Sequence, residues 1–421
     1  MRVDGLPWQR LSSLAAFMVP GLALWLPSGY SWGALLLLLC SLVGVRQWWR
    51  RPLGMASGTT WALAGSFALI GLVWMLDVDG PGGLRNLDRA AKYVVALPCL
   101  FYLLACPPRV RSLWWGMTIG AMGSGLLALY QTGVLGMERA GGFSNAIQYG
   151  NLSLALGLMC ALVWCALGAN LGRWQAMALA VATALGLLGS LLSMSRGGWL
   201  ALGLSLPLWG WLLWRWAYRP MLLRAAALGT LGLLVALVLQ GPQLYQRWVE
   251  ARTETQNYLA HDQANSSVGQ RLDHWRLAWA MGWDRPWTGW GRAGYTAEKQ
   301  QRVAAGQAHP SVLAFDHGHN EFLDLWAKRG LPGVLALLLL YAVPAAIFWP
   351  TRARLRSATG LTDRTTLALR LTGLALPVLY CGFGLTQAFL KHNSGNMFYL
   401  FMLILIFTSL QARQAQRQAP L

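Results

Sequence analysis

The stretch DHGHNEFLDLWAKRGLPGVLALLLLYAVPAAIFW, residues 316–349, contains the two features that decide the fold of this chain. Its first half is polar and carries two histidines and several charges, whereas its second half, 331–349, is almost entirely apolar. An apolar run of about 20 residues is long enough to cross a bilayer as a helix. The stretch therefore predicts a polar segment that joins a membrane-spanning helix at the surface of a membrane.

The whole chain has the composition of a membrane protein. Of its 421 residues, 56% are hydrophobic and 12% are charged, whereas soluble domains are roughly a quarter charged. The net charge of +19 does not indicate nucleic-acid binding, because the Lys and Arg residues lie between apolar runs and form no basic face of a soluble domain. All six cysteines lie in or beside apolar runs, so we expect no disulfide framework and no thiolate metal site.

We expect an all-α integral membrane protein with about 12 transmembrane helices. The apolar segments lie at 11–27, 29–45, 58–76, 93–106, 113–135, 152–169, 176–195, 199–218, 225–241, 331–349, 371–390 and 397–411. They divide the chain into transmembrane helices one to nine (residues 1–241), a long loop (242–330), and transmembrane helices ten to twelve with a cytoplasmic tail (331–421).

The distribution of charge predicts the orientation of these helices. With a cytoplasmic N-terminus, the inner segments hold eighteen basic and two acidic residues, and the outer segments hold sixteen basic and thirteen acidic residues. Cytoplasmic loops of membrane proteins carry such an excess of Lys and Arg. The long loop is therefore expected on the outer side of the membrane.

The long loop, 242–330, contains five of the six histidines of the chain. Within it, 267–282 is expected to be an amphipathic helix, and 284–295 (DRPWTGWGRAGY) is rich in turn residues. The apolar face of the helix is expected to consist of Val268, Leu272, Trp275 and Trp279. A second helix is expected over 320–329, ended by Gly330. A loop of this length without a function would be unusual.

The sequence SMSRGGW, 193–199, places Arg196 at the outer end of an apolar run and before two glycines. The planar guanidinium group matches the geometry of phosphate oxygens, so this position suits a phosphate ligand. The alternative is an arginine that reaches lipid headgroups at the membrane surface. The residues alone favour neither interpretation.

Arg271, His274 and Arg276 lie on the expected amphipathic helix. If the apolar face of this helix packs on the membrane or the protein core, the basic residues point into a groove. The alternative is an interfacial helix whose charges are solvated. The residues alone favour this second interpretation.

His317 and His319 lie two residues apart, directly before a helix. Histidine is the side chain most easily poised as a base near neutral pH. A metal pair is one alternative, but no carboxylate or cysteine set completes a metal site, so we expect none. A structural role for a hydrogen-bonded histidine is the other alternative, and the spacing leaves it open.

Two shorter outer loops also carry basic residues. Arg85, Arg89 and Lys92 are three and four residues apart and share one helix face that suits an anionic headgroup, although Asp88 is placed to pair with them. Arg139 lies among glycines and amides that suit sugar hydroxyls. No GxxxxGK[ST], GxGxxG or HExxH motif occurs in the relevant context. We therefore expect no nucleotide and no cofactor, and the energy of any reaction must arrive in the substrate.

Three of these motifs resemble those of the O-antigen ligase and polymerase superfamily. HGHNEFLDLWAKRGLPG resembles its His-Asn…Gly-Leu-Pro-Gly motif, and SMSRGGWLAL resembles its Ser-Arg-Gly-Gly motif. RLDHWRLAWAM followed by RPWTGWGRAGY resembles its arginine helix and Pro-x-x-Gly-x-Gly turn. The motifs occur in the same order and cover residues 190–335.

The resemblance implies a metal-independent glycosyltransferase of the bacterial inner membrane, with a multi-pass fold and an active site that faces the periplasm. Its donor would be O-antigen linked to undecaprenyl pyrophosphate, and the acceptor of the ligase member is lipid A–core oligosaccharide. Membrane lipids would be further partners. The matching positions imply that Arg196 and Arg271 hold the donor pyrophosphate, that Arg292 joins them, and that His319 is the catalytic histidine.

Arg89 and Lys92 complete the set of residues that we expect at the donor pyrophosphate. Supporting roles are expected for His317, His274, Arg85 and Arg139. All of these side chains are predicted to lie on the outer side of the membrane.

Three alternatives to the ligase remain open: an O-antigen polymerase, a protein O-oligosaccharyltransferase and, in a different class, a secondary transporter. Protein-directed relatives commonly carry additional sequence after the last helix, and polymerases are more divergent in these motifs, so the ligase is favoured. A transporter would hold charges near the bilayer midplane. The expected membrane segments hold almost none.

Overall fold

The computed structural model describes residues 6–49, 57–79, 83–217, 266–357 and 360–418, together with 220, 223, 241, 245–246, 248–250 and 252–256. Within these residues the protein is helical and contains no strand, apart from one isolated bridge between Arg356 and Thr362. The all-α fold predicted from the sequence is confirmed for this part of the chain.

The long helices of the bundle are α1 (Leu6–Gly21), α2 (Gly29–Val43), α4 (Gly58–Met75), α5 (Leu87–Ala105), α6 (Val110–Leu129), α7 (Ala146–Leu167), α8 (Arg173–Leu192), α9 (Arg196–Trp216), α13 (Glu321–Phe348), α15 (Arg364–Gly384) and α16 (Asn393–Gln418). Shorter helices connect them: α3 (Val45–Trp49), η2 (Leu76–Asp79), η3 (Gly83–Asn86), η4 (Tyr130–Val134), η5 (Gly168–Asn170), α14 (Arg352–Leu355) and η7 (Phe389–Lys391).

Eleven of the twelve expected spans coincide with helices of this bundle. The remaining one, 225–241, lies outside the described residues except at its last position. Among the described residues, six helices are long and apolar enough to cross a membrane, including α7, α13, α15 and α16. The chain is thus built as a multi-pass membrane protein, while the number of twelve crossings stays a prediction.

The centre of the bundle consists of α7, α15 and α16, whose apolar segments are mostly buried by other helices. The outer helix α8 packs on α7 at small residues, where a methyl group on Gly186 would lie 2.7 Å from the Cα of Gly157. Close approach through small residues is typical of helix packing in membranes. Outward-facing leucines such as Leu35, Leu204 and Leu335 are about half exposed, as suits side chains that meet lipid.

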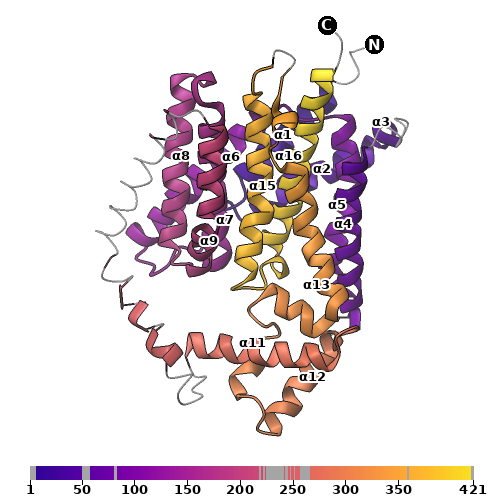
Figure 1. Cartoon of the computed structure of the whole chain (residues 1–421), viewed down its shortest axis with the longest axis vertical. Helices are drawn as coiled ribbons and strands as arrows, with labels where there is room; N and C mark the ends of the chain where they lie inside the picture. Colours follow the sequence, from indigo (N-terminus) through magenta and orange to yellow (C-terminus); the bar gives the residue numbers. More distant parts are fainter. Residues whose placement is uncertain are drawn as a thin grey trace.

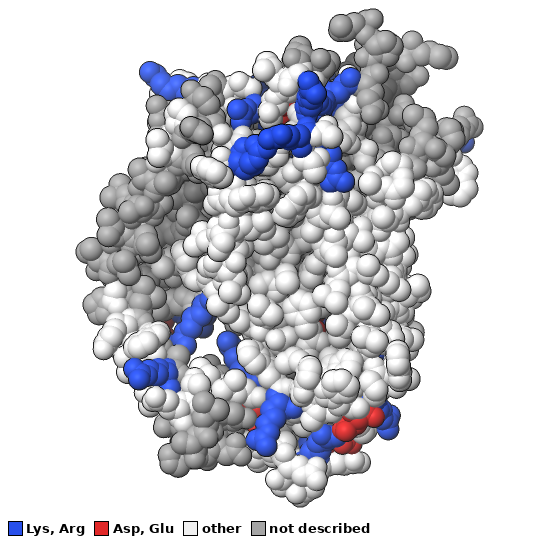
Figure 2. Space-filling view, in the orientation of Figure 1, with Lys and Arg blue, Asp and Glu red and all other residues white. Residues whose placement is uncertain are grey.

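Charged side chains gather at the two ends of the bundle. In the face shown in Figure 2, Lys and Arg lie at the top and at the bottom, and the band between them is almost free of charge. An uncharged band between charged ends is the arrangement that a bilayer requires, because charges in its apolar core are costly.

The long loop forms a small helical layer at one end of the bundle. It contains α11 (Ser267–Asp284), α12 (Gly291–Ala304) and η6 (Pro310–Ala314), and the end of α16 lies at the opposite end of the molecule (Figure 1). This layer has its own hydrophobic core, formed by Leu277, Ala278, Met281, Tyr295, Val312 and Ala327. The helix expected over 320–329 is the first part of α13, which bends at Gly330 (φ 62°) before it enters the bundle.

The structure adds detail to the predictions for the loop. The face of α11 that packs on the protein carries His274, Ala278 and Met281, whereas Trp279 is 54% exposed. Trp279 joins an aromatic group with Trp283 and Trp326. The turns of the stretch 284–295 lie before Gly291, where α12 begins.

The side of the membrane on which the loop lies can be tested by labelling. We expect a cysteine at the exposed Gln256, in a cysteine-free background, to react with an impermeant maleimide in intact spheroplasts. A cysteine at the exposed Arg352, in the loop between α13 and α15, should react only after lysis. The reverse pattern would contradict the predicted orientation.

Candidate functional site

A tight turn before α13 carries the two neighbouring histidines. His319 has a φ of 50°, a left-handed conformation that costs a non-glycine residue roughly 1–2 kcal/mol. The turn is fixed from both sides: the amide of Gly318 donates to Asp324 Oδ1 (3.0 Å), and Asn320 caps α13 by accepting from Phe322 N and Leu323 N. The surrounding structure therefore overcomes the strain and fixes the direction of the His319 side chain.

The imidazole of His319 is held at one nitrogen. Its Nδ1 lies 3.1 Å from Oε1 of Gln387, and Nε2 of Gln387 lies 3.2 Å from Nε2 of His392. Since Gln387 Oε1 can only accept, this contact places a proton on Nδ1 and leaves Nε2 as a base. Nε2 makes no hydrogen bond with any residue that the structure describes, and the side chain is partly exposed.

The histidines of the site are held neutral. Burial lowers the pKa of His317 and of His274 to about 3, from an ordinary value near 6.5. Burial, followed by the positive charge of Arg271, also lowers the pKa of His319, although its hydrogen bond to Gln387 acts in the opposite direction. A neutral imidazole at neutral pH is able to accept a proton.

The charge of Arg271 acts on His319, and those of Arg196 and Arg139 act on Arg271; we call these three arginines the arginine cluster. Burial and then the charges of Arg196 and Arg139 lower the pKa of the half-buried Arg271, whereas Arg139 and Arg196 themselves are exposed. An anion that binds between them offsets this repulsion and accepts hydrogen bonds from their guanidinium groups.

Local structure explains why these arginines converge. Arg271 lies on the same stripe of α11 as the buried His274 and Ala278, so it points toward the bundle and not to solvent. Arg196 is the first residue of α9. Arg139 donates from Nε to the carbonyl of Ser193, 3.0 Å away, next to the start of that helix.

His274 is fully buried, and neither ring nitrogen has a hydrogen-bond partner among the described residues. Its ring lies edge to face with that of His319, at a centroid distance of 5.5 Å. The sequence placed this histidine in a groove, and the structure places it in the wall behind His319.

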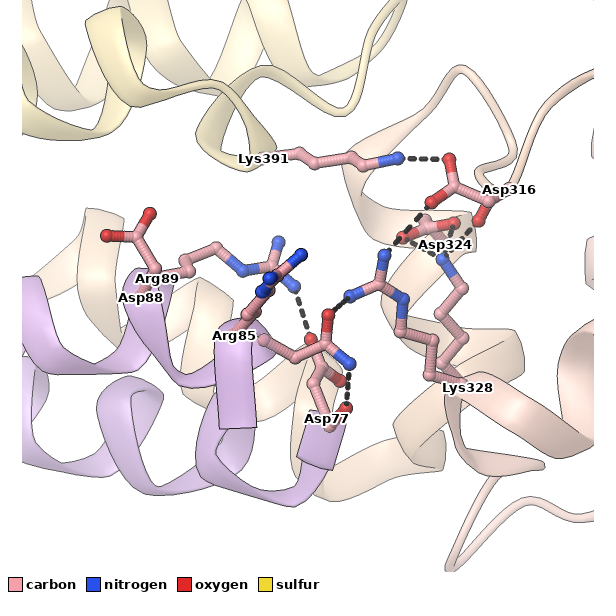
Figure 3. A pocket seen from close by; sticks show the side chains of 10 residues that line it. Asp77, Arg85, Asp88, Arg89, Asp316, Asp324, Lys328 and Lys391 are labelled. Carbon is pink, nitrogen blue, oxygen red and sulfur yellow. Dashed lines mark hydrogen bonds and ion pairs between the residues drawn. The ribbon is translucent and has the colours of Figure 1, made fainter. Parts of the chain in front are cut away.

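A second polar site lies around Asp316, and we call it the Asp316 pocket (Figure 3). It is a cavity of about 160 Å³ lined by Asp77, Arg85, Asn86, Asp88, Arg89, Arg292, Asp316, Asp324, Lys328 and Lys391. Asp316 pairs with both Arg292 (3.3 Å) and Lys391. Burial alone would raise the pKa of Asp316, but the hydrogen bond and charge of Lys391, followed by the charge of Lys328, hold it well below the usual range. The lining comes from four separate parts of the chain that meet at the outer end of the bundle.

The structure thus divides the predicted donor residues between two sites. Arg196 and Arg271 lie in the arginine cluster, whereas Arg89, Arg85 and Arg292 line the Asp316 pocket, and Lys92 lies beside it, paired with Asp88. Arg89 pairs with Asp77 at 2.6 Å. No residue of the arginine cluster lines the Asp316 pocket.

Sequence reasoning missed Gln387 and Lys391. Both lie in the short segment TQAFLKHN, 386–393, between α15 and α16. The sequence feature that could have indicated them is the cluster of polar residues between two apolar helices. This segment reaches the site because it packs against the start of α13. Glu321 accepts from the amide of Leu390 (2.8 Å), and Asn320 donates to the carbonyl of Leu385 (3.0 Å).

Residues 181–338 match the family model described as O-antigen ligase. The matched segment contains Arg196, Arg271 and both histidines of the turn. This segment of the chain is therefore similar to the O-antigen ligase family. This confirms the resemblance to the O-antigen ligase and polymerase superfamily. The chain is also similar to an uncharacterized protein of Haemophilus influenzae, with 25% identity over 375 residues that cover 89% of this chain and 92% of the relative.

The anion affinity of the arginine cluster can be measured directly. Inorganic pyrophosphate should raise the melting temperature of the purified protein, because it neutralises the arginine cluster. Arg271→Ala should remove most of this rise. Arg276→Ala, which removes an exposed arginine of the same helix, should not. An equal loss in both variants would mean that only overall positive charge matters.

Proposed function

We propose that this protein is an O-antigen ligase that transfers polysaccharide from undecaprenyl pyrophosphate to lipid A–core oligosaccharide at the periplasmic face of the inner membrane. The observation that carries the proposal is the position of a neutral, oriented His319 beside three mutually repelling arginines at the end of a membrane bundle. The site combines a base with an anion-binding group, and both are needed for glycosyl transfer from a pyrophosphate donor.

The negative charge of its pyrophosphate determines where the donor binds. In the proposed complex, the pyrophosphate lies between Arg196 and Arg271, with Arg139 close by, and the lipid chain extends into the bilayer along the outer helices. When the bond between the anomeric carbon and the phosphate oxygen breaks, negative charge grows on the pyrophosphate. Arginines fixed beforehand stabilise this charge without reorganisation at the moment of reaction.

The acceptor hydroxyl is activated by His319. Its proton moves to Nε2 of the imidazole while its oxygen forms a bond with the anomeric carbon of the donor. The electron pair of the broken bond leaves with the lipid pyrophosphate. Because the hydroxyl attacks opposite the leaving group, the proposed step inverts the anomeric centre.

Gln387 acts in this scheme as a positioning residue. Its carbonyl oxygen accepts from Nδ1–H of His319 and so keeps the lone pair on Nε2, which faces the substrate. His392 accepts from the other side of the same amide and fixes its orientation. A second group that orients the base is a common feature of nucleophile activation.

The function is tested most simply by deleting the gene and separating the lipopolysaccharide on a gel. A ligase predicts loss of the O-antigen ladder while lipid-linked polymer accumulates. Cores that carry a single repeat would indicate a polymerase. An unchanged ladder would contradict both roles.

The two neighbouring histidines should differ in their effect on catalysis. We expect His319→Ala to reduce transfer by a factor on the order of 10²–10⁴, as for loss of a general base, while the donor still binds. His317→Ala should cost far less, because its Nδ1 accepts only from the amide of His319. Both variants are compared on the same donor and acceptor after thermal melting has been checked. An inactive His317→Ala beside an active His319→Ala would reverse the assignment.

The role of Gln387 can be read from a pH profile. Because the pKa of His319 is lowered, transfer by the wild type should persist below pH 6.5 and decline only as the imidazole becomes protonated. Gln387→Glu places a carboxylate beside Nδ1 and favours the imidazolium, so the acid limb should move up by about one pH unit or more. Gln175→Glu, at the start of α8, serves as the matched control. An unmoved acid limb in Gln387→Glu would show that Gln387 does not act on the base.

A further inference from the structure

The charges that line the Asp316 pocket do not balance. The lining contains five cationic side chains and four carboxylates, and each carboxylate already has a cationic partner. Asp77 is shared by Arg89 and Arg329, and Asp316 is shared by Arg292 and Lys391. A purely structural network needs no such sharing.

Arg85 is the clearest surplus charge. It lies in η3 at the rim of the Asp316 pocket, is exposed, and makes no ion pair or hydrogen bond with any described residue. Figure 3 shows Arg85 on the same side of the pocket as Arg89, opposite Asp316. Guanidinium groups offer the paired donors that phosphate oxygens accept.

The size of the cavity also suits a small anion. Its volume is about 160 Å³, well above the volume that a single water molecule needs. Lys328 and Asp324 form its buried wall and are joined by an ion pair of 2.8 Å. A phosphate group with its first waters fills such a space.

The position of the pocket suits the binding of a group of the second substrate, the acceptor. Asp316 lines the pocket, and His319, only three residues later, lies beside the arginine cluster. Three residues of chain span at most about 11 Å. A group bound in the pocket is therefore near the proposed base, but the arginine cluster that would hold the donor pyrophosphate does not line it.

We propose that the Asp316 pocket binds a phosphate group carried by a sugar of the acceptor, on or near the residue whose hydroxyl is glycosylated. The inference rests on the proposed glycosyl transfer and adds to it a site that selects the acceptor. A phosphate monoester, with a charge close to −2, neutralises more of the surplus positive charge than a carboxylate does. On binding, it competes with Asp316 and Asp77 for the cations that these carboxylates share.

The test compares two acceptors and two proteins. Transfer is measured with native acceptor and with acceptor treated by a phosphatase, for the wild type and for Arg85→Ala. We expect Arg85→Ala to raise the KM for native acceptor roughly fivefold, the effect of an exposed ion pair, and to leave the KM for donor unchanged. Phosphatase treatment should raise the KM of the wild type at least as much, and Arg85→Ala should then add no further loss. Arg276→Ala is the control, as an exposed arginine outside the pocket.

The outcomes separate this inference from the proposed function. If the wild type transfers glycan but phosphatase treatment changes nothing, or if Arg85→Ala affects both acceptors equally, the acceptor-phosphate site is wrong and the ligase function stands. If the wild type transfers to neither acceptor, both proposals fail. As an independent readout, glucose 6-phosphate should raise the melting temperature of the wild type and not that of Arg85→Glu, and an equal rise in both would also contradict the site.

Discussion

The turn Gly318–Asn320 bears the geometric constraint on which the rest of the site depends. It joins a loop layer outside the bundle to a helix that runs into it, and it holds His319 in a left-handed conformation. Three hydrogen-bonded anchors stabilise this conformation: Asp324 at the preceding amide, the Asn320 cap, and Gln387 at the ring itself. Because α13 fixes the backbone and the segment after α15 fixes the ring, the imidazole of His319 has one orientation.

The membrane accounts for the location of the chemistry. An apolar bundle cannot hold unpaired charge at low cost, so the cations and carboxylates gather at its ends, where α11, α12 and the outer ends of the long helices meet (Figure 1). At that boundary the cations divide into two populations. Those around Asp316 and Asp77 have carboxylate partners, except Arg85, whereas Arg196 and Arg271 repel one another and favour an external anion. The two sites therefore differ in how far local carboxylates neutralise their cations, and the proposed pyrophosphate site is the less neutralised of the two.

Local pattern was enough to predict much of this architecture. The apolar runs located the bundle helices, the helix at 267–282 was found within two residues, and Gly330 was correctly expected to end the straight part of its helix. The buried face of α11 was not predictable in this way, because bulky tryptophans dominated the apolar count yet pack together at the surface. The role of Gln387 and the partners of Arg89 and Arg292 could not be predicted from the sequence for a more general reason. The pairing of charges, and the contact between an amide and an imidazole, depend on contacts between segments up to about 200 residues apart.

The central claim is that the pyrophosphate of the donor lies in the arginine cluster with its sugar toward Nε2 of His319. A cryo-electron microscopy structure with a non-transferable lipid pyrophosphate glycan would test it most directly. The account predicts density for the two phosphates against Arg196 and Arg271, with the anomeric carbon on the His319 side and the Asp316 pocket free of donor. Density for the two phosphates of the donor in the Asp316 pocket, or an anomeric carbon directed away from His319, would contradict it.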